Sequence, residues 1–360
     1  MSSRSRVSSV PLVDWGKAVA SQLIVLHHLV IYGPMAREAD PLAPDVFAWL
    51  ADPARLVVQL FLVIGGYLAA RSLMPEPARA AQARWQALPE LAVTRYWRLA
   101  KPALVALAAA LLAALVARWL MDDPSTPPAP TWRQALANAL FLQDIVGEDA
   151  LTVGLWYVAI DLQLFVGLAV LSAGLRLTRL RDRALAAVAV TLVGGLVVAS
   201  LCDFNRHADL DMWAIYFFGS YGLGVLAHWV RQRRYRAGWL LALAAVVGVA
   251  LWVDWRSRIA LAGAMAVWLG SGLGGRTLAA SALMPLARWL SGISYEVFLM
   301  HYPVSLLVGA VVHNWWPDSL PINFMGLMAA WGLSLMAGVG LNKLFSRPAT
   351  PRVVPAAASA

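Results

Sequence analysis

Long apolar blocks alternate with short polar segments along the whole chain. The blocks hold roughly 17–22 residues each, and a helix of that length crosses a hydrocarbon core of about 30 Å. The pattern therefore predicts ten membrane-spanning helices, which lie near residues 13–33, 55–74, 101–121, 154–175, 184–203, 211–230, 237–254, 257–274, 290–312 and 321–344.

Composition supports this interpretation by excluding an ordinary soluble protein. Hydrophobic residues make up 60% of the chain and charged residues 14%, whereas a soluble domain is about a quarter charged. We therefore expect an all-α integral membrane protein, a bundle of about ten transmembrane helices. One membrane domain is expected over residues 1–346, followed by a Pro- and Ala-rich cytoplasmic tail over 347–360 that we expect to be disordered.

The placement of the basic residues predicts the orientation of the bundle. An even number of spans leaves both termini on one side, and if that side is the cytoplasm, most of the 29 Lys and Arg residues are cytoplasmic, as the positive-inside rule requires. The net charge of +9 is then a signal of topology. We expect a multi-pass protein of the cytoplasmic (inner) membrane that contacts lipids and binds no nucleic acid. Because Cys202 is the only cysteine, we expect no intrachain disulfide and no metal site.

Ionisable side chains occur inside the first predicted span. Such a group costs about 2.5–3.5 kcal/mol on insertion scales, which makes it a candidate functional residue. At about 100° per residue, Asp14, Lys17 and His28 lie on one stripe of the helix, whereas His27 points to another face. We expect His28 to be functional, with Lys17 about 16 Å away along the same helix, and His27 to be structural.

Further polar or aromatic residues fall inside or beside three other spans. They are Arg95 and Arg98 before the third span, Trp156, Asp161 and Gln163 in the fourth, and Tyr295, Glu296 and His301 in the ninth. A buried carboxylate must be paired, solvated or protonated. An alternative role stays open for Asp161, Gln163 and His301, because such residues often only join neighbouring helices by hydrogen bonds.

Five motifs, in the same order along the chain, resemble those of the acyltransferase type 3 family of multi-pass membrane acyltransferases. They are the spacing of Asp14, Lys17 and His28; Gly66-Tyr67-Leu68; Arg95, Arg98 and Pro102; Trp156, Asp161 and Gln163; and Ile293-Ser294-Tyr295 with His301 and Pro303. The chain departs from the family pattern where Lys17 replaces the commoner Arg and Asp161 replaces Glu. The segment TRYWRLAKP is also one residue longer before its proline.

The resemblance implies that an acyl group, often acetyl, moves from cytoplasmic acyl-CoA to a hydroxyl of an extracytoplasmic glycan or lipid-linked sugar. Acyl-CoA is then a co-substrate, and we expect no permanently bound cofactor. We expect His28 to be the general base on the acceptor hydroxyl. Histidine has an unperturbed pKa of about 6.5, so its neutral form can remove a hydroxyl proton near neutral pH. A transient acyl carrier is the less favoured role.

The other residues are expected to support this reaction. Lys17 and Asp14 would line the cytoplasmic half of the cavity, and His301 would orient a ligand or assist a second proton transfer. Because guanidinium groups bind phosphate in a bidentate manner, Arg95 and Arg98 would hold the phosphates of CoA. The walls of the cavity would be shaped by Trp156, Asp161, Gln163 and Tyr295.

Two other functions stay open at this point. A transporter or exporter of a polar solute or saccharide would explain membrane histidines, a buried aspartate and broken helices equally well. Against it, the chain lacks two halves with matching interrupted helices. The chain could also be a family member that has lost its chemistry and binds an assembly enzyme, although the intact spacing from Lys17 to His28 weighs against this. The acceptor also stays open among glucans, O-antigen, capsule, peptidoglycan, macrolides and lipids.

Overall fold

A computed structural model describes residues 10–74, 76, 85–178 and 180–346. Within these residues the chain forms helices and contains no strand, which confirms the predicted all-α class. The predicted disordered tail over 347–360 lies outside the described residues, so it stays a prediction.

Each of the ten predicted spans contains a long helix. These helices are α1 (Pro11–Ile31), α4 (Val58–Leu73), α5 (Leu88–Leu120), α8 (Leu155–Leu177), α9 (Asp182–Cys202), α10 (Ala214–Arg231), α11 (Arg236–Val253), α12 (Ser257–Ser271), α14 (Met284–Trp315) and α15 (Leu320–Phe345). Shorter helices connect them: α2 (Pro34–Ala39), η1 (Asp40–Leu42), α3 (Pro44–Ala51), η2 (Pro53–Val57), η3 (Trp85–Ala87), α6 (Trp132–Ala139), α7 (Gln143–Val146), η4 (Phe204–Arg206), η5 (Ala208–Leu210) and α13 (Gly275–Ala280).

The number of these helices that can cross a membrane is smaller than ten by length and composition. In the described part of the chain, 7 helical segments meet that test, and an eighth does so when α1 is joined to Pro34–Leu42, which is bent away from it by 87°. Helix α12 has only 15 residues, fewer than the roughly 20 that a span needs. The chain is therefore a multi-pass membrane protein, while the count of ten and the side of the termini stay predictions.

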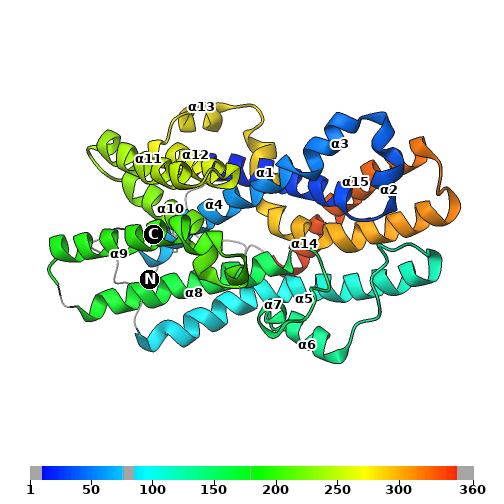
Figure 1. Ribbon diagram of the computed structural model, residues 1–360, viewed down its shortest axis with the longest axis horizontal. Helices are drawn as coiled ribbons and strands as arrows, with labels where there is room; N and C mark the ends of the chain where they lie inside the picture. The colour runs from blue at the N-terminus through cyan, green and yellow to red at the C-terminus, as the bar shows by residue number, and fades with distance from the viewer. Residues whose placement is uncertain (1–9, 75, 77–84, 179, 347–360) are drawn as a thin grey trace, which may run out of the picture.

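The long helices lie along the long axis of the molecule (Figure 1). Helices α9–α12 gather toward one end, and α14, α15 and the second half of α5 extend to the other end, where α2 and α3 also lie. Helix α1 packs against both α14 and α4, and α4 packs against α10. Helices α1 and α4 therefore connect the two halves of the bundle. Both helices also line the candidate site.

Helix α5 is longer than the sequence pattern predicted. It begins at Leu88, ahead of the predicted span 101–121, and its 33 residues extend about 50 Å at 1.5 Å per residue. The chain after α5 then turns back along this helix. A hydrogen bond holds it there, since the hydroxyl of Tyr96 donates to the carbonyl of Ala139 at 3.0 Å. Figure 1 shows α6 and α7 beside the middle of α5. The segment between α5 and α8 is thus folded against the bundle, and Arg95 and Arg98 lie within a helix.

Two glycines allow α4 and α10 to touch along their backbones. A Cβ atom at Gly66 would lie 1.8 Å from the carbonyl oxygen of Tyr221, and one at Gly224 would lie 1.9 Å from that of Val63. No side-chain motion can relieve an overlap with backbone atoms. The close approach of α4 and α10 therefore requires glycine at both positions, as is common where membrane helices pack.

Replacing either glycine should separate the two helices. We expect Gly66→Ala and Gly224→Ala each to lower the free energy of unfolding by about 1–3 kcal/mol, the usual cost of overpacking. Thermal or chemical unfolding of the purified protein in detergent micelles measures this change. The matched control is Gly195→Ala on α9, where a Cβ meets no atom within 4 Å. Equal stability of all three variants would contradict the proposed packing constraint.

Candidate functional site

A large cavity lies between six helices: α1, α4, α5, α8, α14 and α15. Its volume is about 1210 Å³, above the usual range of about 300–1,000 Å³ for small-molecule sites. The lining includes seven of the predicted site residues: Lys17, His28, Arg95, Arg98, Trp156, Asp161 and Tyr295. The structure therefore brings most of the residues singled out from the sequence to one place.

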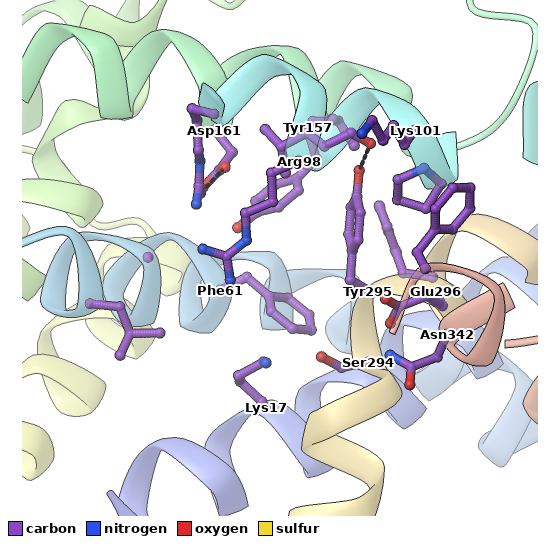
Figure 2. A pocket seen from close by; sticks show the side chains of 18 of the residues that line it. Lys17, Phe61, Arg98, Lys101, Tyr157, Asp161, Ser294, Tyr295, Glu296 and Asn342 are labelled. Atoms are coloured by element: carbon purple, nitrogen blue, oxygen red, sulfur yellow. Dashed lines mark hydrogen bonds and ion pairs between the residues drawn. The ribbon is translucent and has the colours of Figure 1, made fainter. Parts of the chain in front are cut away.

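Three cationic side chains line the cavity without an ion-pair partner among the described residues: Lys17 of α1, and Arg98 and Lys101 of α5. Lys17 and Arg98 extend toward the same space beside Phe61 (Figure 2). Lys101 was missed by the sequence analysis, although its position three residues after Arg98 on a helix was a usable signal. A cavity with unpaired cations is suited to an anionic ligand.

Two carboxylates accompany Lys17 in different ways. Asp14 lies one turn earlier on α1 and accepts a hydrogen bond from the hydroxyl of Ser291 at 3.2 Å, but it does not line the cavity. Glu296 of α14 does line the cavity, and one of its buried oxygens has no hydrogen-bond partner among the described residues. The sequence analysis noted Glu296 as a buried polar residue and gave it no role.

His28 forms a hydrogen-bonded pair with His301. The Nδ1 atom of His28 lies 2.8 Å from Nε2 of His301, and the two rings are stacked with centroids 4.8 Å apart. His301 is buried behind His28, with 1% of its surface exposed, and is absent from the cavity lining. The pair joins α1 to α14, and only His28 reaches the cavity.

The hydrogen bonds of this histidine pair define its protons. Nδ1 of His301 lies 2.5 Å from the carbonyl oxygen of Phe298, which can only accept, so that nitrogen carries a proton. In a neutral His301, Nε2 is then an acceptor, and Nδ1 of His28 donates to it. A neutral His28 is left with an unprotonated Nε2, which has no partner among the described residues. His28 thus offers a free basic nitrogen.

His27 has a separate environment. Its Nδ1 atom lies 2.8 Å from the carbonyl oxygen of Leu50, so it ties α1 to the end of α3. The pairing fits the structural role that was expected for His27.

Arg95 and Asp161 form an ion pair in the cavity wall. A nitrogen of Arg95 lies 2.5 Å from a carboxylate oxygen of Asp161, and the guanidinium also lies over the ring of Phe165 at 4.8 Å from its centroid. Arg95 thus neutralises a buried carboxylate that α8 brings into the bundle. Arg95 was expected to bind a phosphate, but its guanidinium is already paired with Asp161. Arg98 and Lys101 are therefore the cavity-lining cations of α5 that have no ion-pair partner among the described residues.

The remaining predicted residues divide between wall and scaffold. Tyr295 lines the cavity and donates its hydroxyl to the carbonyl of Leu99 at 2.9 Å, which holds α14 against α5 (Figure 2). Gln163 lies outside the cavity wall, because its amide binds the carbonyl of Met212 at 3.1 Å and the N–H of Ala214 at 2.9 Å. Gln163 therefore joins α8 to the start of α10, the alternative that the sequence left open.

Comparison with known proteins adds one finding. The model of a family described as "Acyltransferase domain" matches residues 10–341, a range that includes every residue of the cavity except those at the end of α15. Comparisons with curated proteins and with solved structures gave no match.

Breaking the Arg95–Asp161 pair should destabilise the bundle. We expect Arg95→Met to lower the free energy of unfolding by about 3–5 kcal/mol, because it leaves the buried carboxylate of Asp161 without its partner. The double variant Arg95→Met/Asp161→Leu should recover most of that loss. Chemical unfolding in detergent micelles measures both.

The control removes an exposed pair. Arg55 and Asp52 form an ion pair whose side chains are more than half exposed, and Arg55→Ala should change stability by no more than about 1 kcal/mol. If Arg95→Met proves as stable as Arg55→Ala, the pair does not hold the wall.

Proposed function

Because this chain belongs to the acyltransferase family whose model it matches, we propose that its cavity moves an acyl group from cytoplasmic acyl-CoA to a hydroxyl of an extracytoplasmic glycan or lipid-linked sugar. The observation that carries the proposal is one cavity lined by both Lys17 and His28. The two residues are eleven positions apart on α1, which is about 16 Å along the axis. One end of the cavity is thus cationic and the other holds a base.

The cationic end suits the donor. Acyl-CoA carries phosphates at one end and a thioester at the other, joined by a long neutral arm. Arg98 can bind phosphate oxygens through two parallel hydrogen bonds, and Lys17 and Lys101 add positive charge. The phosphates would lie among these residues, and the arm would carry the thioester toward His28.

The histidine end suits the chemistry. Nε2 of His28 would take the proton of the acceptor hydroxyl as its oxygen attacks the thioester carbonyl. A carbon–oxygen bond then forms, the carbon–sulfur bond breaks, and the proton passes from His28 to the leaving thiolate of CoA. A covalent acyl-histidine intermediate is the less favoured route.

His301 would act as a positioning residue. Its Nδ1 proton is held by the Phe298 carbonyl, and its Nε2 receives the proton of His28 Nδ1. This arrangement fixes the ring of His28 and directs its free nitrogen away from His301. We further propose that the enzyme works in the cytoplasmic membrane, where cytoplasmic acyl-CoA and an extracytoplasmic acceptor can both be reached.

Removing the proposed base should abolish the reaction. We expect His28→Ala to reduce CoA release from acetyl-CoA by about 10²–10⁴-fold, the usual contribution of a general base, while the protein still inserts and folds. His301→Ala should reduce it less, because His28 keeps its basic nitrogen. Free CoA is measured with purified protein in lipid vesicles, with and without candidate glycans.

The control is His207→Ala, since His207 is exposed and lies between η4 and η5. Wild-type activity in His28→Ala would disprove the assigned role. If the folded wild type did not bind acetyl-CoA in a thermal-shift assay, the donor would be wrong and a transporter would be the better assignment.

The proposed phosphate contacts can be tested by changing the donor. We expect Arg98→Ala to raise the KM for acetyl-CoA by about tenfold or more, since hydrogen bonds to charged groups contribute about 1.5–3 kcal/mol. The KM for S-acetyl-N-acetylcysteamine, a thioester without phosphates, should stay unchanged. Steady-state kinetics of both donors measure the difference, and an equal rise for both would place Arg98 away from the phosphates.

A further inference from the structure

A second, smaller cavity lies one helical turn beyond the histidine pair. Tyr32 follows His28 by four residues, and Tyr302 and Ser305 follow His301 by one and four, so the same two helices provide the walls of both places. The ring of Tyr32 lies 5.6 Å from that of His28 and 6.0 Å from that of Tyr302. The cavity is lined by Tyr32, Gly33, Pro34, Met121, Ser125, Tyr302, Ser305, Leu306 and Gly309. The histidine pair therefore lies between two cavities.

The two cavities differ in charge. The large one contains Lys17, Arg98 and Lys101, whereas no Lys, Arg, His, Asp or Glu among the described residues lines the small one. The small cavity instead has the hydroxyls of Tyr32, Tyr302 and Ser305, for which the described residues provide no hydrogen-bond partner. A hydroxyl group both donates and accepts, so another hydroxyl can satisfy these three. The small cavity is suited to a neutral, hydroxyl-bearing molecule.

The small cavity is closed in this structure. Its volume is about 30 Å³, room for one or two water-sized groups. Arg37 of α2 is paired with Asp123, which follows α5, and Asp123 also accepts hydrogen bonds from the N–H and hydroxyl of Ser125 at 2.8 and 2.5 Å. We call the pair Arg37–Asp123 the latch. It joins the two sides of the cavity, because Pro34 lies beside Arg37 on one side and Ser125 beside Asp123 on the other.

The latch is charged at neutral pH, and a glycine lies at the corner that leads into α2 on one of its sides. Burial raises the pKa of Asp123, but hydrogen bonds from Ser125 and Arg37 outweigh it and hold the pKa below its usual value. Between α1 and α2, Gly33 has a φ of 93°, a conformation that only glycine adopts easily, and a Cβ there would meet no atom within 4 Å. The backbone at the α1–α2 corner therefore has open space around Gly33, while α2 beyond it is packed through the buried Met35, Ala36 and Ala39.

We propose that the small cavity is the inner end of the acceptor's path, a binding site for the hydroxyl of a neutral sugar, and that the latch opens to admit it. The inference rests on the proposed function, because it supplies the second substrate of the same histidine pair. The donor occupies the cationic cavity, the acceptor occupies the neutral one, and they meet at His28. Tyr32 and Tyr302 stand between the two substrates and would contact the sugar with their rings and hydroxyls.

Cysteine labelling tests the path without requiring turnover. Ser305→Cys is introduced in a Cys202→Ser background and exposed to a membrane-impermeant, positively charged methanethiosulfonate, added to either face of oriented vesicles. We expect labelling only from the extracytoplasmic face, and about tenfold faster when Arg37→Ala is added, since a hydrogen-bonded ion pair is lost. The controls are Arg55→Ala, which breaks an exposed pair, and Ser334→Cys, which is fully buried.

The consequence for transfer is measured with two acceptor probes, glucose and octyl β-D-glucoside, which separate a free sugar from one carried on a lipid-like chain. Labelled Ser305→Cys should lose ester formation with either probe but still bind acetyl-CoA in a thermal-shift assay. Labelling from the cytoplasmic face, rates that do not depend on Arg37, or full transfer after labelling would each overturn the acceptor path. Those results would leave the donor site and His28 untouched, because their tests depend on CoA binding and release.

Discussion

Polar groups inside an apolar bundle must find partners within the protein, because lipid cannot supply them. Several polar side chains of the bundle obey this constraint by joining two helices. His28 is bound to His301, Arg95 to Asp161, and Gln163 to the backbone of α10. The helices that carry these residues are thereby fixed relative to one another. The exceptions carry information, since a polar group without a partner is retained at a cost to stability.

Some of the exceptions lie beside the two cavities, whereas others, such as Trp15, Thr152 and Asn323, line neither of them. Lys17 and the buried oxygen of Glu296 line the large cavity, whose wall also contains the exposed Arg98 and Lys101, and the unpaired hydroxyls of the small cavity lie one turn beyond the histidine pair. This distribution is the reason why we propose different ligands for the two cavities. Unpaired cations attract an anion, whereas hydroxyls satisfy a neutral polyol. The histidine pair lies between the two cavities: His28 lines the large one, and its ring is 5.6 Å from that of Tyr32, which lines the small one.

The sequence predicted what a single helix determines. Lys17 and His28 lie on one face of α1 because helical geometry relates residues eleven positions apart, and both reach the cavity. It did not predict what depends on contacts between helices. The spacing within α14 cannot reveal that His301 supports His28 from behind, nor that Asp161 takes Arg95 as its partner. Gln163 shows the same limit, because one residue can line a cavity or join two helices.

Apolar periodicity also cannot determine where a helix stops when polar residues continue it. The predicted third span begins at residue 101, yet α5 starts at Leu88, since Arg95 finds Asp161 and Tyr96 finds the carbonyl of Ala139. Tertiary partners thus extended the helix through a stretch that looked like a loop. This extension matters for function, because it changes Arg98 from a loop residue into one held on a rigid wall. A cation on a helix keeps its position relative to Lys17, and a fixed pair of charges can orient a phosphate in a way that a loop could not.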